Sequence, residues 1–290
     1  MKFSSWIYAA RPKTLVASFL PIVSSIIIIP NSIQINFSIF IYTVLSALFI
    51  QIGTNYINDL YDFLKGADNK FRVGPKRMIQ SGLISLDLMK KGILVSFFIA
   101  FLFGIPLVIK GGWIIVCIGL SAFLFGYLYT ATSFSLAYNG LADFFVLFYF
   151  GIIAVCGSFY LQTGEFSQIA LLIGISMGCL NLLLLIVNNM RDYHNDSRVN
   201  KKTLVVKFGL VFGKLQAVLM FVISSICIYF VGYYLENMFI FFSSLLNFPL
   251  SIIILYDLLY KKDLQLNETL PKASLYLIFH TMLLAVGFWL

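Results

Sequence analysis

Charged residues are scarce in this sequence. They make up 11% of the 290 residues, and only 12 residues are Asp or Glu. A soluble domain averages about a quarter charged residues. Hydrophobic residues reach 60% and the mean hydropathy is +0.94, while the longest polar segment, about 58–92, is too short for a soluble domain. These shortages exclude a soluble globular protein and predict an integral protein of the lipid bilayer, with residues 1–290 as a single membrane-embedded domain.

Cysteine is also sparse, and its positions carry no pattern. The four cysteines lie inside apolar stretches, without the paired spacing of a metal site or a disulfide framework. We therefore expect small buried apolar side chains at these positions. They are Cys117, Cys156, Cys179 and Cys227.

Long apolar stretches, in contrast, are plentiful. A membrane-spanning helix needs roughly 20 apolar residues. The candidate spans lie near residues 15–30, 35–57, 93–110, 112–130, 139–161, 168–189, 215–235, 238–256 and 272–290. Only Lys110, Gly111 and Gly112 separate the third span from the fourth, so these two must form a tight hairpin. The pattern predicts an all-α polytopic protein with nine transmembrane helices.

The basic residues indicate the orientation. Nine spans place the N-terminus and the segments 58–92, 131–138, 190–214 and 257–271 on one face of the membrane. Every lysine and arginine except Lys110 lies in or beside these segments. Under the positive-inside rule this face is cytoplasmic. The net charge of +8 thus reflects topology and anionic ligands, and it does not indicate nucleic acid as a partner.

The first unusual cluster of polar residues closes the second span. It contains Asn55, Asn58, Asp59 and Asp62. Carboxylates at a membrane boundary are costly and usually functional. On a helix, Asn55, Asp59 and Asp62 are four and three residues apart and share a face, with Asn58 offset by one position.

A second cluster ends the sixth span in the same way, with Asp192 and Asp196 four residues apart and Asn188 and Asn189 before them. Because four spans separate the clusters, both lie on the same side of the membrane. This internal echo predicts two helical halves around a central cavity, and sites between repeats are common in membrane proteins. Hard cations such as Mg²⁺ bind carboxylate oxygens together with substrate phosphates. Two facing acidic pairs therefore predict Mg²⁺ bridging to a diphosphate.

Basic residues follow each cluster. Arg72 and Arg77 lie in a loop punctuated by Gly74 and Pro75, and Lys201 follows the second cluster. Arginine offers planar, bidentate donors to phosphate oxygens, and lysine offers a compact charge. Together with Arg11 near the N-terminus, we expect these residues to neutralise a diphosphate.

At this point the motifs resemble a known family, the UbiA-type intramembrane aromatic prenyltransferases, and within it the branch that prenylates 1,4-dihydroxy-2-naphthoate. The likeness covers essentially the whole chain. It is carried by Ala10-Arg-Pro-Lys-Thr-Leu15, Asn58-Asp-Leu-Tyr-Asp62 with Arg72-Val-Gly-Pro-Lys-Arg77, Tyr129-Thr130 through Tyr138-Asn-Gly140, and Asn188-Asn-Met-Arg-Asp192 through Asp196 with Lys201-Lys-Thr203. The wider family often has a further Asp four residues after Asp62. Here that position is Gly66 and Asp68 follows it, as in the naphthoate branch.

The resemblance implies transfer of a polyprenyl group from a polyprenyl diphosphate to 1,4-dihydroxy-2-naphthoate, with loss of CO₂, in a bacterial cytoplasmic membrane. The implied Mg²⁺ ligands are Asp59, Asp62, Asp192 and Asp196, with help from Asn55. Either Asp68 or Asp62 would assist deprotonation of the acceptor. The implied substrate-binding residues are Arg11, Asn55, Asn58, Arg72, Arg77, Tyr129, Tyr138, Asn188, Asn189, Arg191 and Lys201.

Other functions remain open at this stage. Within the family, the acceptor could be 4-hydroxybenzoate, haem or homogentisate. CDP-alcohol phosphotransferases also place Asp motifs at a membrane face, but neither cluster here has their Asp-Gly and Ala-Arg signature. A Mg²⁺ or anion transporter would place acidic residues near the middle of a span, where Asp143 is the only candidate.

Overall fold

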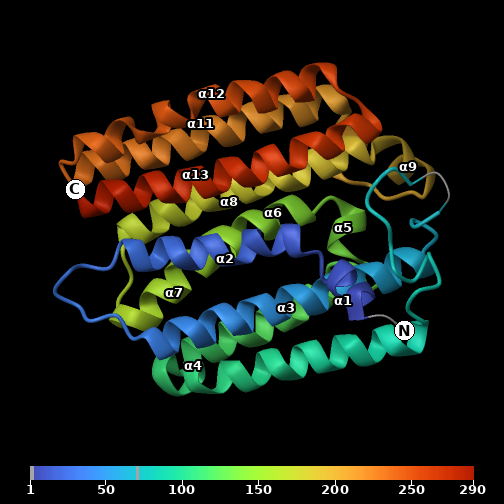
Figure 1. Ribbon diagram of the computed structural model, residues 1–290, viewed down its shortest axis with the longest axis horizontal. Helices are drawn as coiled ribbons and strands as arrows, with labels where there is room; N and C mark the ends of the chain where they lie inside the picture. Colours follow the sequence, from blue (N-terminus) through green and yellow to red (C-terminus); the bar gives the residue numbers. More distant parts are fainter. Residues whose placement is uncertain (1–2, 70–71) are drawn as a thin grey trace.

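The computed structural model describes residues 3–69 and 72–290. Within these ranges the chain is helical and contains no strand (Figure 1). The helices in chain order are α1 (Phe3–Ala10), α2 (Pro12–Ile27), α3 (Phe37–Leu64), α4 (Leu86–Leu128), α5 (Leu136–Asn139), α6 (Ala142–Leu147), the π-helical turn η1 (Phe148–Ile153), α7 (Ala154–Thr163), α8 (Gln168–Arg191), α9 (Tyr193–Arg198), α10 (Leu204–Phe208), α11 (Leu210–Tyr234), α12 (Met238–Tyr260), the 3-10 turn η2 (Asp263–Glu268) and α13 (Thr269–Trp289).

Polar side chains define where several long helices begin. Asn36 accepts the backbone N–H of Ile39 at the start of α3, and Ser167 accepts that of Ala170 at the start of α8. Such caps satisfy N–H groups that have no partner inside the helix. Each of these helices therefore starts at a fixed residue, which fixes the position along the bundle of the site residues at its other end.

The predicted hairpin between the third and fourth spans is present. Helix α4 breaks at Gly112, whose φ of 66° lies in the left-handed region that glycine adopts without strain. Figure 1 shows α4 folding back on itself at the end of the bundle where the C-terminus lies. In the described ranges, seven helices are long and apolar enough to cross a membrane, counting α6 to α7 as one and α4 as one, and α2 is a shorter apolar helix. The chain is an integral membrane protein of the predicted all-α class, while the number nine and the central cavity stay predictions.

Helix α8 forms the core of the bundle. Its side chains Ile173, Met177 and Ile186 are fully buried, and the same apolar cluster extends to α11 and α13. Close approach is made possible by glycine, because a Cβ on Gly178 would lie 2.4 Å from the backbone oxygen of Leu147. Small residues at helix crossings are typical of membrane proteins, where association depends on packing. Elsewhere large apolar side chains such as Trp113 and Leu94 point outward, as expected toward lipid.

The polar loops gather at one end of the bundle. Figure 1 shows α9, the connection between α3 and α4, and the N-terminal helix α1 at the right-hand end, with the C-terminus at the opposite end. Two hydrogen bonds join these loops: Asn267 of η2 donates to the carbonyl of Val73 (3.2 Å), and Asn195 of α9 donates to that of Ala67 (3.0 Å). The segments that carry the two acidic clusters therefore meet, as the internal echo predicts.

Candidate active site

The first cluster lies on an unbroken helical turn. Because α3 continues to Leu64, Asn58 and Asp62 are four residues apart on one face. The buried guanidinium of Arg77 lies between them, with Nη2 2.7 Å from Asn58 Oδ1 and 3.2 Å from Asp62 Oδ2. The loop that follows α3 therefore folds back and brings the Arg77 cation to the acidic face of that helix.

Arg11 reaches the same amide from the other side. It stands between α1 and α2 with a left-handed φ of 53°, and its Nη2 donates to Asn58 Oδ1 at 2.7 Å. Asn55, one turn earlier on α3, instead donates to the carbonyl of Ala10 at 2.9 Å. Asn55 thus ties the α1–α2 junction to α3 and supports the placement of Arg11.

Asp68 lies beside Asp62 after the end of α3. Its Oδ1 is 2.8 Å from Arg72 Nε and 3.3 Å from Arg77 Nε. Burial raises the pKa of Asp68 to about 7, and the neighbouring charge of Asp62 adds to this effect, partly offset by Arg72. The predicted loop arginines and Asp68 thus form one buried group.

Asp59 has different surroundings from those expected of a residue on the Asp62 face. It is only 1% exposed, and its two oxygens accept the backbone N–H groups of Met78 (3.0 Å) and Ile79 (3.3 Å). Asn55, Asp59 and Asp62 do lie on one side of the continuous helix α3, but the oxygens of Asp59 bind the loop backbone, whereas Asn58 and Asp62 share the Arg77 guanidinium. Helical spacing thus predicts the side of the helix on which these residues lie, and the loop after α3 decides which partner each of them has.

The second cluster is not on one continuous helix. Helix α8 ends at Arg191, Asp192 lies between helices, and α9 begins at Tyr193. The Arg191 guanidinium donates to both oxygens of Asp192, at 2.9 and 2.6 Å. Burial alone would raise the pKa of Asp192, but the hydrogen bonds and charge of Arg191 outweigh it and lower the pKa. Asp192 is therefore held as a carboxylate.

Asp196 faces Lys201, whose Nζ lies 3.6 Å from its Oδ1. Burial raises the pKa of Asp196 to about 6, and the Lys201 charge counteracts part of that effect. For Lys201 itself, burial lowers the pKa, yet the charges of Asp196, Asp62 and Asp192 raise it overall. Carboxylates from both clusters thus stabilise the charged form of Lys201.

Tyr138 connects the two clusters directly. Its hydroxyl donates to Asp62 Oδ1 at 2.9 Å, and Lys201 Nζ lies over its ring, 5.6 Å from the centroid. Burial, then the charge of Asp62, raises the pKa of the Tyr138 hydroxyl well above its usual value. The phenol remains a hydrogen-bond donor to Asp62 at neutral pH.

Three further residues that the sequence predicts for substrate binding do not contact the acidic side chains through a hydrogen bond described above. Tyr129 caps the end of α4, and burial raises its pKa to about 12 with smaller effects of nearby charges that include Lys201 and Asp143. Asn188 donates to the carbonyl of Leu184 inside its own helix. Asn189 is buried, and its amide nitrogen has no hydrogen-bond partner among the described residues.

Two residues that sequence reasoning missed organise the site from outside. Lys65 Nζ donates to the carbonyls of Thr130 and Thr132, which holds the loop before Tyr138. Asn267 accepts a hydrogen bond from Arg191 Nη1 at 3.0 Å while it donates to Val73. Lys65 is one of the basic residues that follow the first cluster, and this position was only a weak sequence signal for a role at the site. Asn267 has no sequence signal, because its partners are distant in the chain.

The acidic group fits a divalent cation. Asp68 Oδ2 and Asp196 Oδ2 are buried and have no hydrogen-bond partner in the described part of the chain. Unpaired anionic oxygens of this kind are costly unless a cation approaches them. Within residues 3–69 and 72–290, no three Asp, Glu, His or Cys side chains already form a metal-binding group. The two unpaired oxygens are of the type that Mg²⁺ binds, since this ion keeps waters and uses one or two carboxylates plus substrate phosphates.

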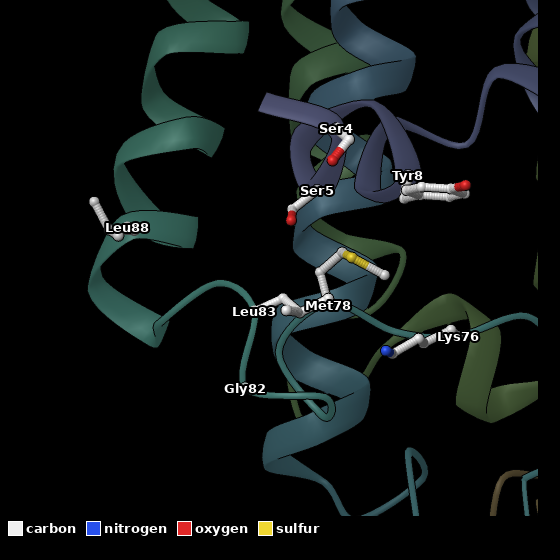
Figure 2. A pocket seen from close by; sticks show the side chains of 8 residues that line it. All are labelled: Ser4, Ser5, Tyr8, Lys76, Met78, Gly82, Leu83 and Leu88. Atoms are coloured by element: carbon white, nitrogen blue, oxygen red, sulfur yellow. The ribbon is translucent and has the colours of Figure 1, made fainter. Parts of the chain in front are cut away.

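Two cavities lie among the loops at this end of the bundle. The larger, about 830 Å³, lies between α1, the start of α4 and the loop after α3, and Figure 2 shows the Met78 side chain between that loop and α1. It is lined by Ser4, Ser5, Tyr8, Lys76, Met78, Gly82, Leu83 and Leu88. The smaller, about 260 Å³, opens beside the second cluster and includes Arg191, His194 and Arg198. The loop from Val73 to Met78 thus contributes to both cavities.

Similar solved structures share this fold. A UbiA homolog from Archaeoglobus fulgidus, solved bound to GPP and Mg²⁺, superimposes with a TM-score of 0.70 over 97% of this chain and 99% of that one, at 17% sequence identity. A UbiA homolog from Aeropyrum pernix K1 gives a TM-score of 0.68 over 94% of this chain and 96% of the other, at 10% identity. At these identities the likeness shows a common fold.

Curated relatives add sequence similarity. The 1,4-dihydroxy-2-naphthoate octaprenyltransferase of Haemophilus influenzae is 30% identical over 234 residues, which cover 78% of this chain and 76% of that protein. The protein of the same name from Escherichia coli is 30% identical over 236 residues, which cover 77% and 75%. The model of the UbiA prenyltransferase family matches residues 18–288. With this match over nearly the whole chain, the protein belongs to the UbiA prenyltransferase family and is a prenyltransferase enzyme.

Proposed function

We propose that this enzyme transfers a polyprenyl group from polyprenyl diphosphate to 1,4-dihydroxy-2-naphthoate with decarboxylation, which gives demethylmenaquinol. The names of the relatives at about 30% identity support this acceptor. The observation that carries the proposal is the meeting of two acidic clusters and four basic side chains at one end of the bundle, linked through the Tyr138 hydroxyl on Asp62. A transporter is a different class from the family to which the chain belongs.

Mg²⁺ would be held by Asp62, Asp68, Asp192 and Asp196. Asp68 and Asp196 each have a buried oxygen without a partner, and the Asp192 side chain keeps 16% of its surface exposed despite its contact with Arg191. Bound Mg²⁺ supplies Lewis-acid stabilisation to the leaving diphosphate. We leave Asp59 and Asn55 out of this ligand set because their polar atoms bind backbone groups of neighbouring segments. The oxygens of Asp62 and Asp192 instead bind side chains, which can rotate toward a substrate phosphate.

The basic residues would bind the diphosphate. Arg77 and Arg11 converge on Asn58, and Lys201 approaches from the second cluster. These donors are fixed before the substrate arrives, which is the condition for strong electrostatic stabilisation of a developing anion. As the allylic C–O bond breaks, the diphosphate takes the electron pair. The cation-like carbon is then attacked by the ring carbon that bears the carboxylate, and CO₂ leaves.

Burial protects this chemistry from water. Asp62, Asp68 and Arg77 are all at most 7% exposed, and exclusion of water strengthens the electrostatic contacts and prevents hydrolysis of the allylic cation. Tyr129 and Tyr138, at the end of α4 and in the following loop, would face the acceptor. From the distribution of basic residues, we propose that this end faces the cytoplasm of a bacterial cell and that the bundle lies in the cytoplasmic membrane.

Purified protein tests the proposal directly. It is incubated in detergent with Mg²⁺, a polyprenyl diphosphate and a panel of aromatic acids, and the products are identified by mass spectrometry. We expect a prenylated naphthoquinol that has lost its carboxylate. Prenylated 4-hydroxybenzoate with its carboxylate retained would reject the proposed acceptor in favour of the benzoate branch. A naphthoate product formed equally well after chelation of divalent cations would reject the metal.

A further inference from the structure

Asp59 has an environment that points to a role different from metal binding. It is 1% exposed, and its oxygens accept two consecutive backbone N–H groups, those of Met78 and Ile79, at 3.0 and 3.3 Å. Two backbone donors are a stable set of partners for a buried carboxylate. The side chain therefore faces the loop, while its neighbour Asn58 faces Arg11 and Arg77.

The two N–H groups belong to the start of a tight turn. Ser81 N–H bonds to the Arg77 carbonyl (3.1 Å), and Leu83 N–H bonds to the Met78 carbonyl (3.0 Å). The first N–H groups of such a turn have no partner inside it. Asp59 of α3 supplies the acceptors for these N–H groups. It acts like an N-capping residue, except that a capping residue belongs to the segment that it caps. The turn is thereby fastened to α3.

Side-chain packing fixes the same turn. Met78 and Ile79 are 2% and 6% exposed, and they pack in one apolar cluster with Tyr56 and Leu60 of α3. Arg77, the residue immediately before Met78, carries the guanidinium that reaches Asn58 and Asp62. A shift of the Met78 backbone would therefore move the neighbouring Cα of Arg77, and with it the guanidinium.

We propose that Asp59 is a positioning residue, which fastens the loop from Arg77 to Gly82 to α3 and so places Arg77 for the diphosphate, and that it is not a ligand of the metal. This assignment deepens the proposed function and rests on the donor site described there.

The first experiment compares Asp59→Asn with Asp62→Asn. Asparagine offers one acceptor oxygen, and its NH₂ group meets the second backbone N–H, so the turn loosens. We expect the KM for polyprenyl diphosphate to rise about tenfold or more, the effect of losing a hydrogen bond to a charged group. The Mg²⁺ concentration for half-maximal rate should stay within about twofold of wild type, on the basis that no metal ligand is lost. In Asp62→Asn that concentration should rise, or turnover should cease. An Mg²⁺ requirement raised equally in both variants overturns the assignment.

A double-mutant cycle tests the link to Arg77. If Asp59 acts through Arg77, Asp59→Asn should add little to the loss in kcat/KM already caused by Arg77→Gln, because residues that act as a unit are not additive. Losses that multiply fully would show that Asp59 acts independently of Arg77, which contradicts the positioning role.

A second pair of variants covers the case in which Asp59→Asn does not fold. Ile79→Pro removes one N–H that Asp59 accepts, and Ile79→Ala shortens the same side chain, by more than proline does, while keeping that N–H. We expect a higher donor KM in the proline variant than in the alanine variant; equal values would contradict the proposal. If the wild-type protein gives no Mg²⁺-dependent prenyl transfer, the proposed function is wrong. If the wild-type protein turns over normally but the variants do not show the expected differences in donor KM, only the role of Asp59 is wrong.

Discussion

At the scale of single residues, Tyr138 holds the most connected position in the site. Its hydroxyl donates to Asp62 at 2.9 Å, and its ring lies under Lys65 Nζ (4.3 Å to the centroid) and near Lys201. Tyr138→Phe keeps the ring and removes only the donor. We expect kcat/KM for prenyl transfer to fall about tenfold, since a hydrogen bond to a charged group contributes about 1.5–3 kcal/mol.

Tyr127→Phe is the matched control for this change. The Tyr127 hydroxyl lies 3.2 Å from that of Tyr61 at the exposed surface, away from the carboxylates, so steady-state kinetics should match wild type. Unchanged kinetics for Tyr138→Phe, or equal losses in the two variants, would remove Tyr138 from the site.

The sequence predicted which side chains come together at this end of the bundle, but it did not predict their individual partners. The resemblance and the spacing pointed to Asp62, Asp196, Arg77 and Lys201, which the structure brings together. The spacing of Asn55, Asp59 and Asp62 equally suited a helical face. Which carboxylate meets the Arg77 guanidinium depends on where a loop about 20 residues later returns to the helix, and periodicity carries no information about that return.

At the scale of helices, the close crossing of α8 with the end of α6 and with η1 sets the packing of the core. A Cβ on Gly178 would lie 2.4 Å from the Leu147 carbonyl oxygen, which is backbone and cannot turn aside. Gly178→Ala should therefore force the helices apart and destabilise the protein by about 1–3 kcal/mol, the usual effect of overpacking. Thermal unfolding in detergent measures this as a lower midpoint.

Gly119→Ala makes the same chemical change where there is room. No atom lies within 4 Å of a Cβ built on Gly119 in α4, and alanine is the better helix former. We expect an unchanged or higher midpoint. Equal midpoints for the two variants would mean that the crossing at Gly178 adapts without strain.

Helix boundaries show which local features sequence can predict. The hairpin at Gly112 followed from consecutive glycines between two apolar runs. The break at Asp192 and the π-helical turn at Phe148–Ile153 have no comparable signal. The segment after the break is held by the bond from Asn195 to the carbonyl of Ala67 in the loop after α3, and the π-helical turn packs against Gly174 and Gly178 of α8.

At the scale of the whole molecule, the site joins segments from both halves of the chain. The loop after α3 touches α9 through Asn195 and η2 through Asn267. Composition and the side on which basic residues fall were enough to predict that these segments share one end of the bundle. The hydrogen bonds that connect them involve single asparagines in irregular segments, and no periodic pattern marks such residues.

A ligand that bridges the halves should therefore stabilise the whole bundle. We expect Mg²⁺ with inorganic pyrophosphate to raise the midpoint of thermal unfolding, because a ligand at 100 times its Kd adds about 2.7 kcal/mol to the folded state. Mg²⁺ alone or pyrophosphate with a chelator should give a smaller shift, since the acidic and basic groups each need the other ligand to offset their charge.

Two variants decide whether this shift comes from the proposed site. Asp196→Asn removes a carboxylate that has a buried oxygen without a described partner, and it should abolish most of the shift. Lys90→Gln removes a charge from an exposed pair with Asp87 (3.6 Å) and should leave the shift intact, because exposed pairs contribute little. A shift that persists in Asp196→Asn, or that sulfate reproduces without Mg²⁺, would show that the anion binds elsewhere and that the two acidic clusters do not act together.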